Sequence, residues 1–423
     1  MLRRIILGLG ANAFSQVITI VIQIFSLPLF LLYWDAATYG SWLVLSALPA
    51  YVGMADVGMV GAAGNKMTMA VGRSDAAEAN RIYQTAQLFM TVMCCSLAAI
   101  IIPAALFLPL PDSMTTDKRI ALAALMCAVL FALYGGLQEA VFKATGRYAA
   151  GTMLGQTVRL AEWGGYMAGL MLFRTLAGVA ICGLVARAAG TAAGVYLSQQ
   201  GDHKFRLGFQ HASKAELLSM IRPAVSLMAF PLASGLSFQG VTLLVAALAG
   251  TTAVAVFNTY RTIARLAVQV TGMFSHAVQP EFSRLFGEAG MKGVRSLYRH
   301  STRLGAVQSI VLSLVLYFMS PFLLRIWTHG RIEFIPSMMM WLLVYAAVGG
   351  VWHVPRILLL ATNQHIGLAG WFLLSGILSV ALGWLFGIIW QVNGICAAML
   401  VSEMFIAAIC TYIAHRLFAE ANS

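Results

Sequence analysis

The stretch Asn258-Thr-Tyr-Arg261-Thr-Ile-Ala-Arg265 places two arginines inside an apolar run long enough to cross a membrane. Arg261 and Arg265 are four residues apart, so they share one face of a helix. An arginine at the bilayer centre costs roughly 2.5–3.5 kcal/mol on insertion scales, and two of them cost about 5–7 kcal/mol. We therefore expect both side chains to face protein or a water-filled cavity, with Asn258 and Gln269 near the same face.

The composition surrounding this stretch is that of a polytopic membrane protein. The chain has 423 residues, of which 60% are hydrophobic and 10% are charged, whereas soluble domains average about 25% charged residues. Apolar segments of about 20 residues, the length that a helix needs to span hydrocarbon, recur from end to end. The net charge of +12 is explained by the positive-inside bias of membrane proteins, so no nucleic-acid partner is implied.

The pattern predicts an all-α fold with twelve transmembrane helices. Their predicted ranges are 9–33, 41–69, 84–109, 118–142, 150–173, 175–198, 219–249, 252–276, 300–327, 336–361, 366–390 and 392–416. We divide the chain into an N-terminal six-helix lobe (1–198), a cytoplasmic linker (199–218) and a C-terminal six-helix lobe (219–423). An even helix count puts both termini on one side of the membrane. Lys and Arg favour that side 18 to 5, with Arg356 counted among the 18 cations outside the membrane, so both termini are predicted to be cytoplasmic.

A weak internal repeat supports the division into two lobes. Gly72-Arg-Ser-Asp-Ala-Ala-Glu-Ala-Asn-Arg-Ile-Tyr83 follows the second predicted helix, and Gly287-Glu-Ala-Gly-Met-Lys-Gly-Val-Arg-Ser-Leu-Tyr298 follows the eighth. The two tyrosines are 215 residues apart (298 − 83), about half the chain. Six helices per repeat preserve orientation, so we expect parallel lobes around a central cavity, with a substrate site near the midplane.

The first two predicted helices carry polar residues that a lipid-facing helix would not need. Asn12, Gln16, Thr19, Gln23 and Ser26 form one stripe at helical spacing. This stripe is interpreted as facing a cavity, with interhelical hydrogen bonding as the alternative. Asp56 falls near the middle of the second helix, where it could serve as a proton relay, a cation ligand or a partner for an arginine.

Other embedded charges have structural or coupling interpretations. Arg159, Glu162 and Arg187 lie on the hairpin of the fifth and sixth helices, and we expect Glu162 and Arg187 to sit at one depth and form a structural ion pair. Glu139 is expected to pair locally with Lys143. Glu403 has no partner within sequence reach, so it joins Asp56 as a candidate coupling residue for an ion gradient of H⁺ or Na⁺.

The two arginines of the eighth predicted helix are the strongest indication of function in the sequence. The structural alternative is a buried ion pair with Asp56 or Glu403. The functional hypothesis is an anion site, because the planar guanidinium presents paired donors that suit phosphate. With Asn258 beside them, the two side chains could hold a pyrophosphate.

No enzyme motif is present in the sequence. There is no Walker sequence, HExxH or GxSxG, and Gly8-Leu-Gly10 follows no strand. The six cysteines and eight histidines lack metal-ligand spacing. The chain is therefore predicted to be a transporter without a cofactor or a metal site.

The first 90 residues resemble O-antigen and exopolysaccharide flippases, the polysaccharide branch of the multidrug, oligosaccharidyl-lipid and polysaccharide exporter superfamily. The resemblance rests on Asn12-Ala-Phe-Ser-Gln16, Leu27-Pro-Leu-Phe30, Tyr39-Gly-Ser-Trp-Leu-Val-Leu-Ser46 and Ala55-Asp-Val-Gly-Met59. It implies a two-lobed fold like that of multidrug (MATE) exporters. It also implies movement of an undecaprenyl-pyrophosphate-linked oligosaccharide to the periplasmic leaflet of a bacterial inner membrane, by alternating access, alongside membrane lipids and polysaccharide polymerase and assembly proteins. The family's usual ion coupling is in question here, because the first helix lacks a carboxylate.

Two other functions stay open at this point. An ion-coupled multidrug exporter of the same fold is the first, although an exporter of organic cations needs a net acidic cavity. A membrane-embedded polysaccharide polymerase or ligase is the second, although the predicted periplasmic loops near Leu110 and Thr328 are short.

Overall fold

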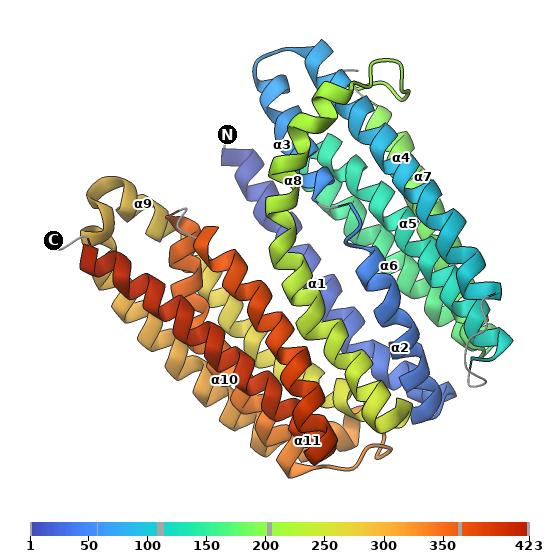
Figure 1. Cartoon of the computed structure of the whole chain (residues 1–423), viewed down its shortest axis with the longest axis vertical. Helices are drawn as coiled ribbons and strands as arrows, with labels where there is room; N and C mark the ends of the chain where they lie inside the picture. Colours follow the sequence, from blue (N-terminus) through green and yellow to red (C-terminus); the bar gives the residue numbers. More distant parts are fainter. Residues whose placement is uncertain (1, 57, 108–113, 201–204, 363–365, 421–423) are drawn as a thin grey trace. The chain divides into compact units, whose positions relative to one another are not determined.

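The computed structural model describes residues 2–56, 58–107, 114–200, 205–362 and 366–420. Of residues 2–9, 12, 222–230, 276–277, 279–280, 283–284 and 287–289 it describes the backbone alone. These described residues form helices and turns, with no strand among them (Figure 1). The helices are α1 (Leu2–Tyr33), α2 (Ala36–Val52), α3 (Met59–Gly72), α4 (Ala76–Phe107), α5 (Thr116–Ala144), α6 (Tyr148–Leu172), α7 (Leu176–Gln199), α8 (Lys214–Gly235), the π-helix η1 (Leu236–Gly240), α9 (Val241–Trp327), α10 (Pro336–Ala361) and α11 (Ile366–Glu420).

The two longest helices contain backbone breaks at predicted helix ends. Within α9, Gly250 has φ +81°, between the predicted helices 219–249 and 252–276. Within α11, Gln391 has φ +50°, between the predicted helices 366–390 and 392–416. Positive φ is incompatible with a continuing right-handed helix. Both predicted boundaries are therefore confirmed.

Eight helical stretches in the described part of the chain are long and apolar enough to cross a membrane. Two of them, Pro231–Ser275 and Gly367–Glu420, have 45 and 54 residues and contain the breaks just described. Each therefore has the length for two crossings of about 20 residues. With α6 and the α2–α3 segment added, these stretches account for the twelve predicted helical segments, and the predicted all-α membrane fold is confirmed.

The second predicted helix is wrong in one respect, because it is not continuous. The described backbone leaves the helix after Val52 and enters α3 at Met59. Gly58 has φ +76°, a conformation that glycine adopts without steric cost. Asp56 therefore lies in the turn before α3 and not in the middle of a helix.

The chain forms two compact units. Unit 1 comprises Met1–Trp34 and Leu45–Met228, and unit 2 comprises Asp35–Val44 and Ala229–Ser423. The start of α2 thus belongs to unit 2, where it packs on the turn at Gly250. A Cβ at Gly40 would lie 1.7 Å from the carbonyl oxygen of Thr251, so this close approach requires glycine.

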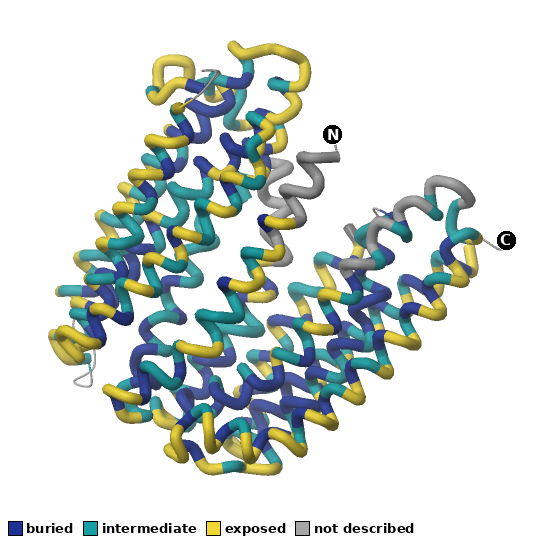
Figure 2. The backbone as a smooth tube through the Cα atoms, turned by 180° about the vertical axis from the view of Figure 1, so that it is seen from behind, coloured by how far each residue is buried: buried dark blue, intermediate teal, exposed yellow. Residues whose placement is uncertain are grey.

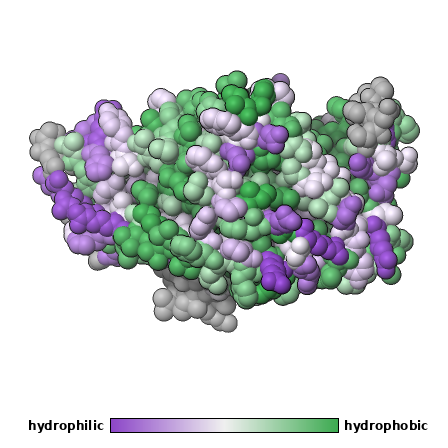
Figure 3. Space-filling view, turned by 90° about the horizontal axis from the view of Figure 1, so that it is seen from below, coloured by the Kyte–Doolittle hydropathy of each residue, from purple (hydrophilic) through white to green (hydrophobic). Residues whose placement is uncertain are grey.

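Within each unit the helices pack lengthwise around a buried interior. In unit 1, α5 and α6 both pack on α7, and in unit 2, α10 packs on α9. Buried positions face the inside of each bundle and exposed positions alternate along its outside (Figure 2). Large apolar side chains such as Phe107 and Phe318 are 80% and 77% exposed, and apolar side chains spread widely over the face in Figure 3. Exposed apolar surface of this extent suits a lipid environment.

Residues 205–213, which we call the strap, are fastened to the first turns of α4. Four side chains of α4 accept hydrogen bonds from backbone N–H groups of the strap. Asn80 Oδ1 accepts from Arg206 N (2.7 Å), and Gln84 Oε1 accepts from His211 N (2.8 Å). Thr85 Oγ1 accepts from Ser213 N (3.0 Å), and Gln87 Oε1 accepts from Gly208 N (3.3 Å). The Phe205 ring packs edge-on against Tyr83. The described part of the predicted linker is therefore an ordered covering of α4.

An ion pair continues this attachment at the start of α8. Lys66 Nζ lies 2.6 Å from Glu216 Oε1, and Arg81 Nε lies 3.9 Å from Glu216 Oε2. Burial alone would raise the pKa of the Glu216 carboxyl, but the hydrogen bond and charge of Lys66 outweigh it and hold the pKa below its ordinary value. The carboxylate is thus charged at neutral pH and ties α8 to α3.

Candidate functional site

Arg261 is buried in unit 2 within a set of neutral acceptors. Its side chain is 3% exposed. Nη1 donates to the carbonyl oxygen of Phe238 (2.8 Å), and Nη2 donates to Thr242 Oγ1 (2.7 Å) and to Asn258 Oδ1. The Nε proton has no hydrogen-bond partner. None of these acceptors is a carboxylate, so no hydrogen-bond partner of Arg261 acts as its counter-ion.

The π-helix η1 supplies one of these acceptors. In residues Leu236–Gly240 each backbone hydrogen bond joins residues five apart instead of four, so the helix is locally wider than an α-helix. The Phe238 carbonyl there accepts from both Arg261 and the hydroxyl of Thr242 (2.9 Å). Local π turns occur frequently at functional sites. Here the turn directs both a carbonyl and an aromatic ring toward the arginines of α9.

Arg265 shares the Phe238 ring with Arg261 but lies at the surface. The two guanidinium carbons are 4.6 Å and 3.7 Å from the centre of that ring. Such cation–π contacts are worth about 0.5–2 kcal/mol each. Arg265 is exposed, whereas Asn258 and Gln269 are half-buried. The two predicted anion ligands therefore have different positions: Arg261 is buried against Phe238 and Asn258, and Arg265 is exposed over the Phe238 ring.

Glu403 is connected to α10 of the same unit. Its Oε1 accepts from Trp352 Nε1 (2.8 Å), and a Cβ at Gly349 would lie 3.0 Å from this oxygen. Arg356, one turn beyond Trp352, lies 5.6 Å above the indole ring. The charges of Arg356 and Glu403 act on each other. Arg356, counted in the sequence among the cations outside the membrane, thus belongs to this interior cluster.

Tyr345 connects the two polar regions of unit 2. Its hydroxyl lies within electrostatic range of Glu403, Arg261 and Arg265. Glu403 is not a hydrogen-bond partner of Arg261. Together Tyr345, Arg261, Arg356 and Glu403 form a polar cluster across α9, α10 and α11, with Arg265 exposed beside it.

In unit 1, Asp56 acts on the backbone of α3. Its carboxylate accepts from Gly58 N (3.3 Å) and Val60 N (3.4 Å). A carboxylate at a helix N-terminus is stabilised by unpaired amides and by the helix dipole. Asp56 thus has a structural role at the start of α3. The sequence analysis did not predict this role, because it placed Asp56 inside a continuous helix.

Two residues of the polar stripe of α1 contact α6. Arg159 Nη1 donates to Thr19 Oγ1 (3.1 Å), and Trp163 Nε1 donates to Ser26 Oγ (2.9 Å). Gln16 is exposed and Gln23 is half-buried. The side chain of Asn12 lies outside the described residues. At Thr19 and Ser26 the geometry is therefore that of interhelical hydrogen bonding.

Glu162 and Arg187 form an ion pair between α6 and α7. The pair is largely buried, with side chains 12% and 18% exposed, and Tyr166 donates a further hydrogen bond of 2.9 Å to Glu162. Arg159 bonds to Thr19 and not to this carboxylate. Unit 1 thus neutralises the charge of Arg187 with a carboxylate.

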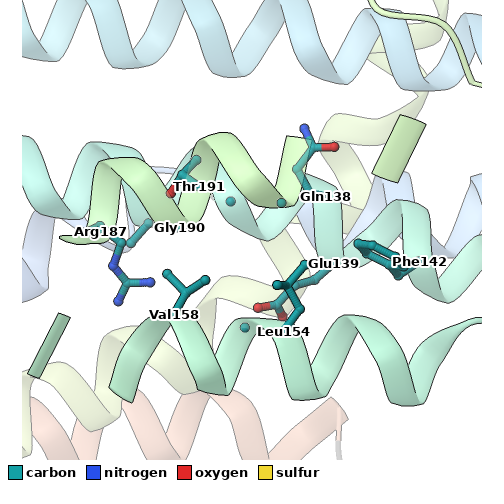
Figure 4. A pocket seen from close by; sticks show the side chains of 12 residues that line it. Gln138, Glu139, Phe142, Leu154, Val158, Arg187, Gly190 and Thr191 are labelled. Atoms are coloured by element: carbon teal, nitrogen blue, oxygen red, sulfur yellow. The ribbon is translucent and has the colours of Figure 1, made fainter. Parts of the chain in front are cut away.

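A small cavity of about 40 Å³ adjoins this ion pair (Figure 4). Glu139, Arg187 and Thr191 line it. Gly155 makes room for Glu139, because a Cβ there would lie 2.0 Å from the carboxylate oxygen. The expected pair of Glu139 with Lys143 is wrong, because Lys143 Nζ bonds to Asn65 Oδ1 (3.1 Å). The asparagine lies on the neighbouring helix α3, which a reading of α5 by itself did not consider.

Comparison with known proteins identifies the fold. No protein-family model and no curated protein matches the chain. Among solved structures, an inward-facing multidrug resistance MATE transporter of the MOP superfamily superposes with a TM-score of 0.72 at 13% identity, covering 95% of this chain and 99% of that chain. An outward-facing one gives 0.62 at 12% identity, covering 99% and 95%.

A third similar structure is a MOP superfamily transporter from Pyrococcus furiosus, described as having a binding pocket of reverse polarity that suggests a different function. Its TM-score is 0.61 at 12% identity, covering 98% of this chain and 94% of that chain. At these identities the likeness establishes the fold. The chain has the fold of MATE transporters of the MOP superfamily over nearly its whole length.

Proposed function

We propose that this protein is a transporter that flips an undecaprenyl-pyrophosphate-linked oligosaccharide across a bacterial inner membrane by alternating access. The observation that carries the proposal is the pair of arginines around Phe238 in unit 2. Arg261 is bonded to neutral acceptors, and Arg265 stacks on the same Phe238 ring and is exposed. A phosphate-bearing head group is the cargo chemistry that an exposed guanidinium suits.

The exposure of Arg265 suggests that this arginine, and not Arg261, meets the cargo. A guanidinium on an apolar helix costs roughly 2.5–3.5 kcal/mol if it faces hydrocarbon. Its position on the Phe238 ring holds it beside Arg261 instead of extending it toward a membrane surface. We infer that Arg265 faces a water-filled space and meets the pyrophosphate there, while Arg261 fixes the ring and Asn258 behind it.

Export of drugs is the second candidate, and the similarity to multidrug resistance transporters favours it. An exporter of organic cations would need acidic groups where its cargo binds. In unit 2, Glu403 is bonded to Trp352 and has Arg356 nearby. This arrangement favours an anionic cargo over a cationic one, in keeping with the reverse pocket polarity described for the Pyrococcus furiosus transporter.

Deletion of the gene separates the two functions. A flippase predicts loss of surface polysaccharide and accumulation of its lipid-linked oligosaccharide in the cytoplasmic leaflet, with unchanged sensitivity to organic cations. Both phenotypes should return to normal when the wild-type gene is restored. Raised drug sensitivity with intact surface polysaccharide and no accumulating lipid-linked sugar would refute the proposal in favour of drug export.

A further inference from the structure

A second cationic site lies in unit 2, at the end of the bundle where the chain terminates. Arg295, Arg299 and Arg303 follow one another at intervals of four along α9, so they share one face. They border a pocket of about 280 Å³ whose other lining residues are Tyr298, Thr302, Val351, Thr411, His415 and Phe418. This volume approaches that of small-molecule pockets, about 300 Å³ and upward.

The three arginines at the rim of the pocket have no hydrogen-bond or ion-pair partner among the described residues. All three are exposed. His415 adds a group that can carry a proton. The nearby Arg416 is already bonded to Glu420 (2.7 Å). The described lining contributes no carboxylate, so the site favours an anion.

Two buried hydroxyls in the wall of this pocket have no partner beyond each other. Tyr298 is 6% exposed, and neither its hydroxyl nor the Thr302 hydroxyl one turn away forms a hydrogen bond of ordinary geometry, although the two hydroxyls lie close enough to interact with each other. A buried polar group without a partner costs about 1–3 kcal/mol and calls for an explanation such as a bound ion. A cytoplasmic excess of arginine is expected from topology, but topology does not explain two buried hydroxyls that have only each other as partners.

The predicted internal repeat allows this pocket to be compared with the corresponding positions of unit 1. At the 215-residue offset, Asn80, Gln84 and Gln87 of α4 correspond to Arg295, Arg299 and Thr302 of α9. In unit 1 backbone N–H groups of the strap donate hydrogen bonds to these amide side chains, and the strap covers them. The residues of unit 2 at the same positions carry guanidinium groups in place of two of the amides, and they line a pocket.

We propose that this pocket binds a phosphate group, either the head group of an anionic phospholipid or a soluble phosphate. The three arginines supply the charge, and Tyr298 and Thr302 supply hydroxyl donors behind it. This site uses none of the residues assigned to the cargo, so it stands whether or not the flippase proposal holds.

The test measures binding to the full-length protein in detergent. Native mass spectrometry with phosphatidylglycerol and, separately, phosphatidylcholine tests the lipid source, and thermal unfolding with inorganic phosphate tests the soluble source. We expect preference for phosphatidylglycerol, stabilisation by phosphate, or both, and the responding ligand identifies the source. Arg299→Gln should weaken the responding interaction about tenfold, because a hydrogen bond to a charged group is lost.

Two further variants test whether the binding is specific to this pocket. Tyr298→Phe keeps the ring contacts with His415 and Phe418 and should weaken binding about threefold to tenfold through loss of the hydroxyl. Arg416→Gln removes a charge from the same end of the bundle but not from the pocket, and should leave binding unchanged. Equal losses in Arg416→Gln and Arg299→Gln, no response to either ligand, or full binding in both Tyr298→Phe and Arg299→Gln would overturn the proposal.

Discussion

Each of the two units buries an arginine, but they satisfy it in opposite ways. Arg187 of unit 1 is bonded to the carboxylate of Glu162, which Tyr166 also contacts. Arg261 of unit 2 is bonded to a carbonyl, a hydroxyl and an amide. The first arrangement pairs opposite charges, whereas the second gives the guanidinium neutral partners only. A buried charge is costly to keep without a counter-ion, and this cost is the reason for which we propose a functional role for the arginines of unit 2.

The difference extends to the neighbours of each arginine. In unit 1 the next cation, Arg159, is exposed and donates to the Thr19 hydroxyl of α1. In unit 2 the next cation, Arg265, is also exposed, but it stacks on the ring that Arg261 braces. The two units therefore differ in the partners of their buried arginine, a carboxylate in unit 1 and neutral groups in unit 2.

The largest effect on stability should come from breaking the ion pair of unit 1. Arg187→Ala leaves the Glu162 carboxylate largely buried without its cation, which typically costs about 3–5 kcal/mol. Thermal unfolding of the purified protein should show this loss. The double variant Glu162→Gln with Arg187→Gln should recover much of it, because no lone charge remains.

Arg73→Gln is a matched control for this measurement. Its guanidinium is bonded to Glu78 at the surface, with the arginine side chain 61% exposed, so the cost should stay below about 1 kcal/mol. If Arg187→Ala unfolds no earlier than Arg73→Gln, the ion pair does not stabilise unit 1 as described.

A smaller loss is expected from Arg261→Met in unit 2. The substitution leaves the acceptors on Phe238, Thr242 and Asn258 without this donor but strands no charge, so we expect about 1–3 kcal/mol. Thermal unfolding measured beside Arg187→Ala gives the ranking. A larger loss for Arg261→Met than for Arg187→Ala would reverse the contrast between the units.

The sequence predicted the helix breaks where local signals are strong. Gly250 and Gln391 fall between two apolar runs, and both adopt positive φ. The break before α3 was not predicted, because the apolar run continues through Pro49 and Gly53 and hides the turn. Asp56 was consequently placed inside a helix, whereas its carboxylate contacts the first amides of α3.

The surroundings of the charged residues were less accessible to sequence reasoning. Arg261 and Arg265 stood out because arginine is costly in an apolar helix. Their shared partner Phe238 lies 23 residues before Arg261 (261 − 238), across the turn at Gly250, and tertiary packing alone brings them together. Arg356 gave a usable signal, since it follows Trp352 by one helical turn within an apolar run, but it was counted as a loop cation.

The most direct test of the central claim is the flipping rate of Arg265 variants in proteoliposomes with a polyprenyl-pyrophosphate-linked oligosaccharide. Loss of a hydrogen bond to a charged group costs about 1.5–3 kcal/mol, so Arg265→Gln should lower the rate about tenfold or more. Arg265→Lys should retain part of the rate, and neither variant should lose more than about 2 kcal/mol of unfolding free energy, the upper value of the cation–π contact with Phe238 that it changes. Flipping by Arg265→Gln at the wild-type rate would contradict the assignment of a phosphate-bearing cargo to this guanidinium.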